Sequence, residues 1–252
     1  MERIAHNHSE YYRYLEDIRR RLYNLVIAFI IFFFVGFLCS GQILKLVIGA
    51  FHLQSAEIVT TSPFQSLDLA MSVGMYTGLV ICLPLFVYHL YGFLRDGLNR
   101  GEKRFFFLLL PAAAGLFLVG FAYGFAILYF TLDTIAAYNA SLGIRNLWDI
   151  SKFLMQLILT SALLGVIFEY PMVLLFLVKV GLITPKFLRE KRRHAVAAMF
   201  ILTSLLPPTD GLSLVIMVLP LIVIYEITII IGTRIARSRL AKRHVRIGEI
   251  IK

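Results

Sequence analysis

Long stretches without charge constrain this chain more than any other feature of its sequence. Charged residues make up 16% of the 252 residues, and they cluster so that several windows of about 18 or more residues are nearly uncharged. About 20 consecutive apolar residues suffice for a helix that crosses the hydrocarbon core of a bilayer. With 59% apolar residues, a soluble domain of this length could not bury its apolar surface. The pattern predicts an all-α integral membrane protein.

Six apolar segments are the most economical division of the chain, and each is predicted to be a transmembrane helix. They lie near 22–43, 68–94, 105–132, 153–178, 195–206 and 212–232. The fifth gives about 18 Å of helix, against a hydrocarbon core of about 30 Å. Either this span is truly short, or its boundary lies further out and its basic end residues reach the interface. The sixth contains Pro220, which favours a kink. Residues 1–252 are expected to form a single membrane domain.

Basic residues predict the orientation of the chain. Of the 25 lysines and arginines, only Lys45, Arg145 and Lys152 fall in the connections expected on one side of the membrane. The others lie in the amino-terminal segment 1–21, in the second-to-third and fourth-to-fifth connections, and in the tail 233–252. Because cytoplasmic loops carry the excess of Lys and Arg, both termini are predicted to be cytoplasmic. Short basic clusters suit topology signals and anionic headgroups, so the net charge of +10 does not indicate nucleic-acid binding.

Sequence motifs for enzymatic or metal chemistry are absent. The chain has no His-Glu-x-x-His pair, no Gly-x-Ser-x-Gly elbow and no phosphate-binding loop. Its six histidines are scattered, and Cys39 and Cys82 lie within apolar runs, as expected for buried thiols. We predict that the protein is not an enzyme and that it has no catalytic residues, bound metal or cofactor.

Glu169 is the most informative residue inside an apolar segment. It lies about ten residues before Lys179, which places it about 15 Å below the cytoplasmic end of its helix, near the middle of the bilayer. An ionised carboxylate there costs about 2.5–3.5 kcal/mol, so the group should face a polar cavity, find a donor or be protonated. Pro171 removes a helical hydrogen bond beside it. The spacing leaves a functional site and a structural hydrogen bond equally open.

Two further acidic residues lie close to the membrane interfaces. Glu226 lies eight residues before Arg234, near the cytoplasmic side, and we favour a structural role for it. Asp210, in the predicted outer turn LPPTDG, is placed to cap the last helix through a side-chain oxygen. Both remain candidates for intramembrane polar or partner contacts.

Acids also lie at the predicted cytoplasmic edge of the membrane. In YYRYLEDIRRRL, Asp17 and Arg21 stand four residues apart on an expected helix, as do Glu16 and Arg20. Such pairs favour a structural interpretation, in which the acids are counter-ions of the arginines. Glu102 lies in a second basic cluster, again just before an apolar helix. The alternative is that Asp17 and Glu102 together bind two guanidinium groups, for which bidentate pairing is geometrically strong.

The sequence motifs at the predicted cytoplasmic edge of the membrane resemble those of the TatC family, the polytopic core of the twin-arginine protein translocase. YLEDIRRRL resembles the opening motif of the family, with Asp17 at its acidic position and Arg19 and Arg21 at its arginines. Asp17 is one methylene shorter than the usual glutamate, so the adjoining Glu16 stays an alternative for the functional acid.

The chain contains four further motifs, and all five motifs occur in the same order along the chain as in the family. YGFLRDGLNRGEKR resembles the first cytoplasmic loop, matching at Phe93, Leu98 and Glu102, although Arg95-Asp96 replaces the usual Ala-Pro. TSPF resembles the outer Ser-Pro motif, and FEYP the fourth-span motif that contains Glu169. LPPTDG with the later LP and YEI resembles the last two spans.

The resemblance implies a cupped bundle of six helices with short fifth and sixth spans in the bacterial cytoplasmic membrane. It implies a core subunit of the twin-arginine translocation complex, which takes part in proton-motive-force-driven transport of folded proteins. Asp17 and Glu102 would receive the paired arginines of the signal peptide, with Phe93, Leu98, Arg19 and Arg21 in the same patch.

The resemblance also implies partners within the membrane. Glu169 and the fifth span would contact the signal peptide or the single-span partners TatA and TatB, in an oligomeric complex. An alternative function is a small-solute or ion secondary transporter that uses Glu169 as its proton or cation site. That alternative leaves the two cytoplasmic acids and the short hairpin unexplained.

Overall fold

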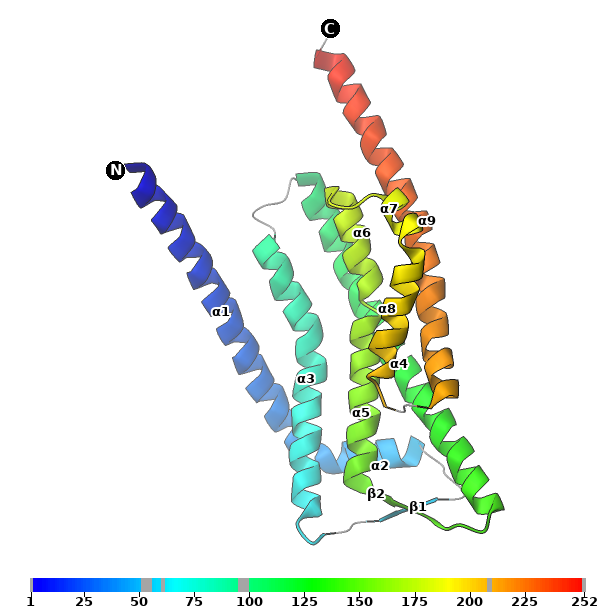
Figure 1. Cartoon of the computed structure of the whole chain (residues 1–252). Coiled ribbons are helices and arrows are strands. Elements are labelled where there is room, and N and C mark those ends of the chain that lie inside the picture. Colours follow the sequence, from blue (N-terminus) through cyan, green and yellow to red (C-terminus); the bar gives the residue numbers. More distant parts are fainter. Residues whose placement is uncertain (1, 51–55, 60–61, 95–99, 208–209, 251–252) are drawn as a thin grey trace. The chain divides into compact units, whose positions relative to one another are not determined.

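The computed structural model describes residues 2–50, 56–59, 62–94, 100–207 and 210–250. Its elements, in chain order, are α1 (Glu2–Leu38), α2 (Ser40–Ala50), β1 (Ala56–Val59), α3 (Gln65–Leu94), α4 (Arg100–Ser141), β2 (Asn146–Asp149), α5 (Ile150–Ile167), α6 (Tyr170–Val180), α7 (Pro185–Glu190), α8 (Arg192–Ser204) and α9 (Gly211–Ile250) (Figure 1). The chain divides into two compact units. The first comprises Met1–Asn99 and Arg145–Met155, and the second comprises Arg100–Ile144 and Gln156–Lys252.

Among the described residues, five helical stretches are long and apolar enough to cross a membrane. They are Ile18–Leu38, Gln65–Phe86, Leu109–Ser141, Ile150–Val180 and Gly211–Arg237. The predicted all-α membrane class is confirmed, and the stretches coincide with five of the six predicted spans. The 31-residue stretch Ile150–Val180 consists of α5 and α6 with a break between them.

The last two predicted spans differ in length. The fifth corresponds to α8, whose 13 residues give about 20 Å of helix, so a fifth helix shorter than the hydrocarbon core is confirmed. The prediction of a short sixth span is wrong, because the apolar stretch Gly211–Arg237 has 27 residues. Pro220 lies inside α9 without ending it, and the helix continues into the basic tail, where Arg and Lys are good helix formers.

In the first unit, α1 and α3 run antiparallel (Figure 1). They pack closely through glycines. A Cβ atom added to Gly74 would lie 2.7 Å from the carbonyl oxygen of Phe33, and one added to Gly36 would lie 2.6 Å from Cβ of Thr77. Small residues at such positions let two backbones approach, which is a common basis of helix packing in membranes.

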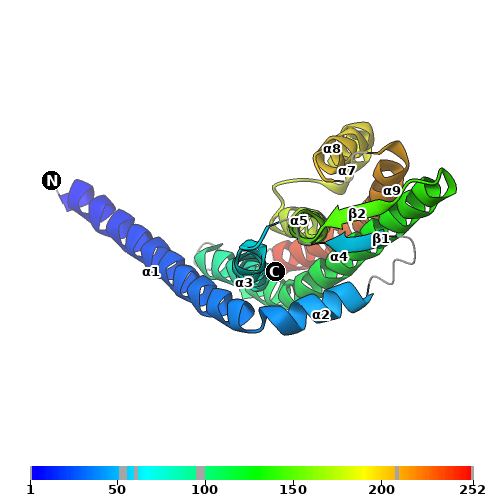
Figure 2. The ribbon, with the colours of Figure 1, turned by 90° about the horizontal axis from the view of Figure 1, so that it is seen from below.

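The long connections of the first unit contain structure that the sequence did not indicate. After a turn at Cys39 the chain forms α2, which contacts α3, and β1 then pairs with β2 in a parallel two-stranded sheet (Figure 2). Ala56 stands opposite Asn146, and Val59 opposite Asp149. This pairing joins segments about 90 residues apart in the chain, too far for any local sequence pattern to indicate it.

A buried glutamine ties the start of α3 to the start of α5. Nε2 of Gln65 donates to Oδ1 of Asp149 and to Oγ of Ser151, both at 2.9 Å. The same Asp149 oxygen accepts the amides of Ser151 and Lys152, and thus caps α5. Gln65 directly follows the predicted turn at Ser62 and Pro63, which is confirmed.

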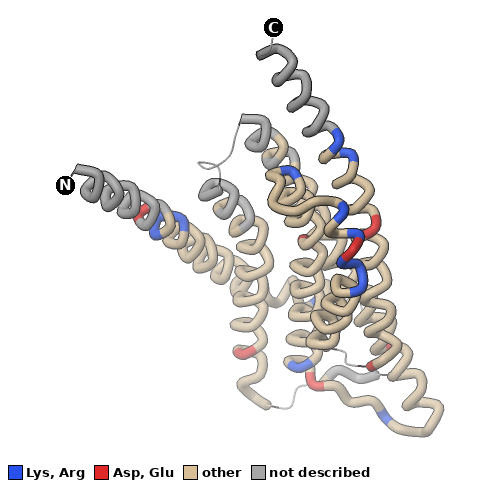
Figure 3. The backbone as a smooth tube through the Cα atoms, turned by 45° about the horizontal axis from the view of Figure 1, so that its top comes forward, with Lys and Arg blue, Asp and Glu red and all other residues tan. Residues whose placement is uncertain are grey.

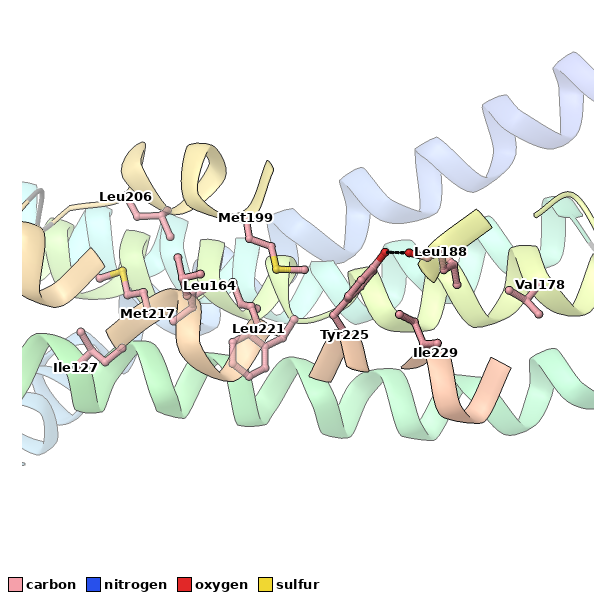
Figure 4. Close-up of a cluster of buried hydrophobic side chains, with 12 residues drawn as sticks. Ile127, Leu164, Val178, Leu188, Met199, Leu206, Met217, Leu221, Tyr225 and Ile229 are labelled. Carbon is pink, nitrogen blue, oxygen red and sulfur yellow. Dashed lines mark hydrogen bonds between the residues drawn. The ribbon is translucent and has the colours of Figure 1, made fainter. Parts of the chain in front are cut away.

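In the second unit, α4 packs on α5 through glycines, while α6, α8 and α9 enclose an apolar core. A Cβ atom on Gly124 would lie 2.7 Å from Cα of Ser161, and one on Gly120 would lie 2.7 Å from the Phe168 side chain. The core contains, among others, the side chains of Leu164, Met199, Met217, Leu221 and Ile229, each at most 4% exposed (Figure 4). These contacts fix the backbone around Glu169.

Candidate functional site

The arginine cluster of the opening motif lies within α1, in the first unit. Arg19 and Arg20 are exposed, whereas Arg21 is partly buried and donates from Nη1 to the carbonyl oxygen of His89 in α3, at 3.1 Å. Glu16 is exposed, and among the described residues it forms no ion pair with Arg20. The counter-ion pairing expected from the helical spacing of these two residues is therefore not formed.

Four members of the predicted signal-peptide patch fall outside what the structure describes. Side chains are not described for Asp17, Phe93 and Glu102, and Leu98 lies in the undescribed segment 95–99. The backbone confirms that Asp17 lies within a helix, α1, and that Glu102 lies near the start of α4. Whether the two carboxylates act together stays a prediction.

Glu169 lies in the break between α5 and α6. Phe168 and Glu169 form a turn, and the Glu169 amide donates to the carbonyl of Val166, three residues back, at 3.0 Å. Pro171 lies in the first turn of α6. The interruption that Pro171 predicts beside Glu169 is confirmed, and its cause is the missing proline N–H.

Aromatic side chains hold the backbone on both sides of Glu169. Phe168 is 2% exposed, and its ring centroid lies 5.9 Å from that of Tyr123 in α4. The Tyr170 hydroxyl donates to the carbonyl oxygen of Leu221 in α9, at 2.5 Å. The main chain at Glu169 is thus fixed from two neighbouring helices.

The carboxyl group of Glu169 is partly buried and does not cap α6. It forms no hydrogen bond or ion pair with any residue that the structure describes. The structural hydrogen bond considered from the sequence is therefore not formed in the described part of the chain. A carboxyl group in an apolar surrounding gains most from a donor, so this group is suited to one supplied from outside the chain.

Asp210 and Glu226, in contrast, have partners within the second unit. Oδ2 of Asp210 accepts the amide of Ser213 at 2.9 Å, which confirms the predicted cap of α9. Oε2 of Glu226 lies 2.7 Å from Nη2 of Arg192, and the two side chains are 44% and 48% exposed. This ion pair joins α9 to the start of α8 and agrees with the structural role favoured for Glu226.

Tyrosine hydroxyls form a set of polar contacts that sequence reasoning missed. Tyr123 donates to the carbonyl oxygen of Ile216 at 2.7 Å. Tyr225 donates to that of Leu188 at 2.8 Å, as Figure 4 shows. Pro220 lacks the N–H that would bond the carbonyl of Ile216 four residues earlier. Tyr123 supplies that donor. Backbone polar groups in a bilayer must be satisfied internally, so Pro220 was a usable signal that such a donor exists.

Comparison with known proteins identifies the family. The family described as Sec-independent protein translocase protein (TatC) matches residues 13–220. The chain belongs to the TatC family. The TatC-family protein TatCy of Bacillus subtilis (strain 168) is 26% identical over 99% of this chain and 100% of its own length. TatC of Listeria innocua is 30% identical, over 87% of this chain and 89% of its own length.

A solved TatC structure has the same fold. The crystal structure of the twin arginine translocase receptor TatC matches with a TM-score of 0.74 and 27% identity, over 88% of this chain and 99% of that chain. The resemblance recognised in five sequence motifs is thereby confirmed. The chain is a multi-pass membrane protein of a translocase family, and the alternative of a small-solute transporter is set aside.

Proposed function

We propose that this TatC-family chain is the signal-peptide receptor and core subunit of a twin-arginine translocase in a bacterial cytoplasmic membrane. The observation that carries the proposal is the match, over 88% of the chain, to the solved twin arginine translocase receptor. The chain acts as one membrane domain with both termini in the cytoplasm, which the one-sided distribution of Lys and Arg supports. It works with TatA- and TatB-like single-span proteins to move folded substrates, driven by the proton-motive force.

The receptor patch lies at the cytoplasmic edge. The carboxylates of Asp17 and Glu102 receive the two guanidinium groups of the signal peptide, since a carboxylate and a guanidinium pair in a bidentate manner. Phe93 and Leu98 supply apolar contacts beside them. Glu16 forms no described ion pair with Arg20, one turn away on α1, which supports acidic side chains that are available to a ligand in this segment.

Arginines of the chain position this patch. The contact from Arg21 to the carbonyl of His89 holds α1 against α3 close to Asp17 in sequence. Arg19 is exposed and adds to the positive electrostatic potential of this segment, but it does not take part in that contact. Both residues are therefore positioning groups, and the carboxylates are the binding groups.

Glu169 is the proposed contact for a partner within the membrane. Its support is the combination of a fixed backbone and a carboxyl group with no described donor. A polar or cationic group of the signal peptide or of a single-span partner would supply that donor. Glu226 and Asp210, which have internal partners, contribute to this region through the positions of α8 and α9.

Site-specific photocrosslinking of a twin-arginine signal peptide to the protein in native membranes tests the receptor role. Asp17→Ala and Glu102→Ala are each expected to lower crosslinking about tenfold, because a hydrogen bond to a charged group contributes about 1.5–3 kcal/mol. The matched control is Glu190→Ala, an exposed acid of α7 in the predicted cytoplasmic connection. Wild-type crosslinking in all three variants would count against the receptor role.

A second arm separates the two adjacent acids and tests the geometry. Glu16→Ala is expected to leave crosslinking near the wild-type level if Asp17 is the functional acid. Replacing the two signal arginines by lysines should weaken wild-type binding, since an ammonium cannot form the bidentate fork. A twin-lysine peptide that crosslinks as well as the twin-arginine one would contradict paired recognition by carboxylates.

A further inference from the structure

An open groove runs along one face of α8 in the second unit. It has a volume of about 530 Å³, within the range of about 300–1,000 Å³ that is usual for sites of small ligands. Its lining includes Lys191, the N-cap of α8, and His194, Ala195, Ala198, Met199 and Leu202 of α8. Their spacing is i, i+3, i+4, i+7, i+8 and i+11, so they form one continuous stripe on the helix. Tyr170 and Leu174 of α6 also line the groove.

The two ends of the stripe differ in polarity. Lys191 and His194, both exposed, stand at the end that begins α8, and every residue beyond them on the stripe is apolar. Neither side chain forms an ion pair or hydrogen bond with a described residue. Figure 3 shows lysines and arginines gathered at α7 and the beginning of α8. One end of the groove is thus cationic and the rest is apolar.

The nearby charges leave Lys191 available to an anion. The positive charge of Arg192 is compensated by Glu226, at 2.7 Å. The carboxylate of Glu190 lies 3.9 Å from Lys186, in an exposed pair. The N-terminus of α8 has no side-chain cap, and a helix N-terminus favours negative charge. Glu169 is not among the residues that line the groove.

The length of the groove matches one leaflet. From residue 191 to residue 202 the α8 stripe spans about 16 Å, and half of a hydrocarbon core is about 15 Å. A single acyl chain therefore fits along the stripe with its headgroup at the cationic end. The shortness of α8 strengthens this fit, because the bilayer beside a short helix must thin or tilt its lipids.

We propose that the α6–α8 groove is a specific site for an anionic phospholipid. One acyl chain lies against Ala198, Met199 and Leu202, and the phosphate group is bound by the Lys191 ammonium and the His194 imidazole. The groove has a cationic end that complements a phosphate group, and an apolar lining about as long as one leaflet is thick. These two features distinguish a lipid from a protein helix, which would require no cation at that end. The inference depends on the membrane location of the chain and not on the receptor role of the acids.

Photocrosslinking with a lipid probe tests the headgroup. The protein is placed in nanodiscs with phosphatidylglycerol that carries a photoreactive group on one acyl chain, and in parallel with the same probe on phosphatidylcholine. We expect the anionic probe to label the peptides containing residues 170–174 and 195–202 several times more strongly. Lys191→Gln should lower that labelling about fivefold, since one Lys near a membrane surface contributes about 1 kcal/mol. The control Arg193→Gln, an exposed neighbour outside the groove, should leave it unchanged.

A pair of bulky substitutions tests the groove itself. Ala198→Trp fills the stripe and should abolish labelling, whereas Ala197→Trp, at an exposed neighbour that does not line the groove, should not. Size-exclusion profiles and thermal unfolding establish that both variants are folded. If Ala198→Trp does not fold, the comparison of Lys191→Gln with Arg193→Gln decides alone.

Three results would overturn the proposal. Equal labelling by the two headgroups would mean nonselective lipid at the protein surface. Equal labelling of the two tryptophan variants would mean that the acyl chain lies elsewhere. In native membranes, crosslinks from position 198 to a protein helix and none to lipid would show that the groove is a protein interface.

Discussion

The helices within each of the two units are held together by different kinds of contact. In the first unit, α1 and α3 approach each other at glycines, and only 6% of an 18-residue apolar window within Ile18–Leu38 is buried. In the second unit, 33% of such a window is buried in each of the stretches Leu109–Ser141 and Gly211–Arg237. There, hydroxyl groups of Tyr123, Thr160 and Tyr170 bond backbone carbonyls of other segments, in addition to glycine packing.

This difference between the two units shows which contacts can stabilise helix association in a bilayer. Lipid tails are as apolar as leucine, so close packing and interhelical hydrogen bonds, rather than burial of apolar area, stabilise helix association. The second unit combines both, whereas the α1–α3 contact depends mainly on close packing, with Arg21 bound to α3 near one end. A single change at a glycine should therefore loosen the first unit more than the second.

Gly74→Ala is the change with the largest expected effect. The added Cβ atom would lie 2.7 Å from the backbone oxygen of Phe33, which cannot rotate away. Overpacking of this kind costs about 1–3 kcal/mol of the free energy of unfolding, measured by denaturant titration in detergent micelles. The control Gly115→Ala meets no atom within 4 Å and should be neutral or slightly stabilising, because Ala is the better helix former.

Gly124→Ala sharpens this test in the second unit. Its Cβ atom would lie equally close, 2.7 Å from Cα of Ser161 in α5. However, α4 is also held by a 2.6 Å hydrogen bond between Thr131 and Ser213 of α9, which does not depend on this contact. Hydrogen exchange of backbone amides should rise across α1 and α3 in Gly74→Ala, and only near the substitution in Gly124→Ala. An equal rise in hydrogen exchange across the two units would contradict the proposed difference between them.

Sequence reasoning located the elements that depend on local chemistry. The apolar runs placed five membrane-crossing stretches and the short α8, because span length is a property of consecutive residues. Pro171 marked the interruption beside Glu169, and Asp210 marked the start of α9. Of the candidate site, the sequence predicted the helix cap formed by Asp210 but left open whether Glu169 has an internal partner, and the structure describes none for its carboxyl group.

What the sequence missed depends on contacts between distant segments. The β1–β2 pairing and the ion pair of Arg192 with Glu226 join residues far apart in the chain, for which one sequence offers no periodicity to detect. The length of α9 was misjudged because a basic tail after an apolar run looks like a helix end, although its residues favour helix. The resemblance to TatC, carried by ordered motifs, supplied the function that composition alone could not.

Removal of the Tyr123 hydroxyl should have the next largest effect. Tyr123→Phe leaves the carbonyl of Ile216 without the donor that Pro220 cannot provide. Hydrogen bonds between membrane helices average about 0.6 kcal/mol and reach about 1.7 kcal/mol, and this one should lie toward the upper value because its acceptor has no helical donor. Denaturant titration of the free energy of unfolding measures the loss.

A double-mutant cycle with Pro220→Ala shows whether the proline is the cause. Alanine restores an N–H four residues after Ile216, so the cost of Tyr123→Phe should fall in that background. Tyr225→Phe, whose hydroxyl bonds Leu188 instead, is the matched control and should cost the same with or without Pro220. A Tyr123 effect that is independent of residue 220 would contradict the proposed compensation.

The ion pair between Arg192 and Glu226 should contribute least to the second unit. Because both side chains are nearly half exposed, solvent screens the pair, and we expect a coupling energy of about 0.2–1 kcal/mol in a cycle of Arg192→Gln and Glu226→Gln. The coupling should fall further at high salt. The pair of Lys186 and Glu190, at 3.9 Å and more exposed, should show less still. A salt-independent coupling larger than that of Tyr123 with Pro220 would mean that charge, and not hydroxyl-to-carbonyl bonding, distinguishes the second unit from the first.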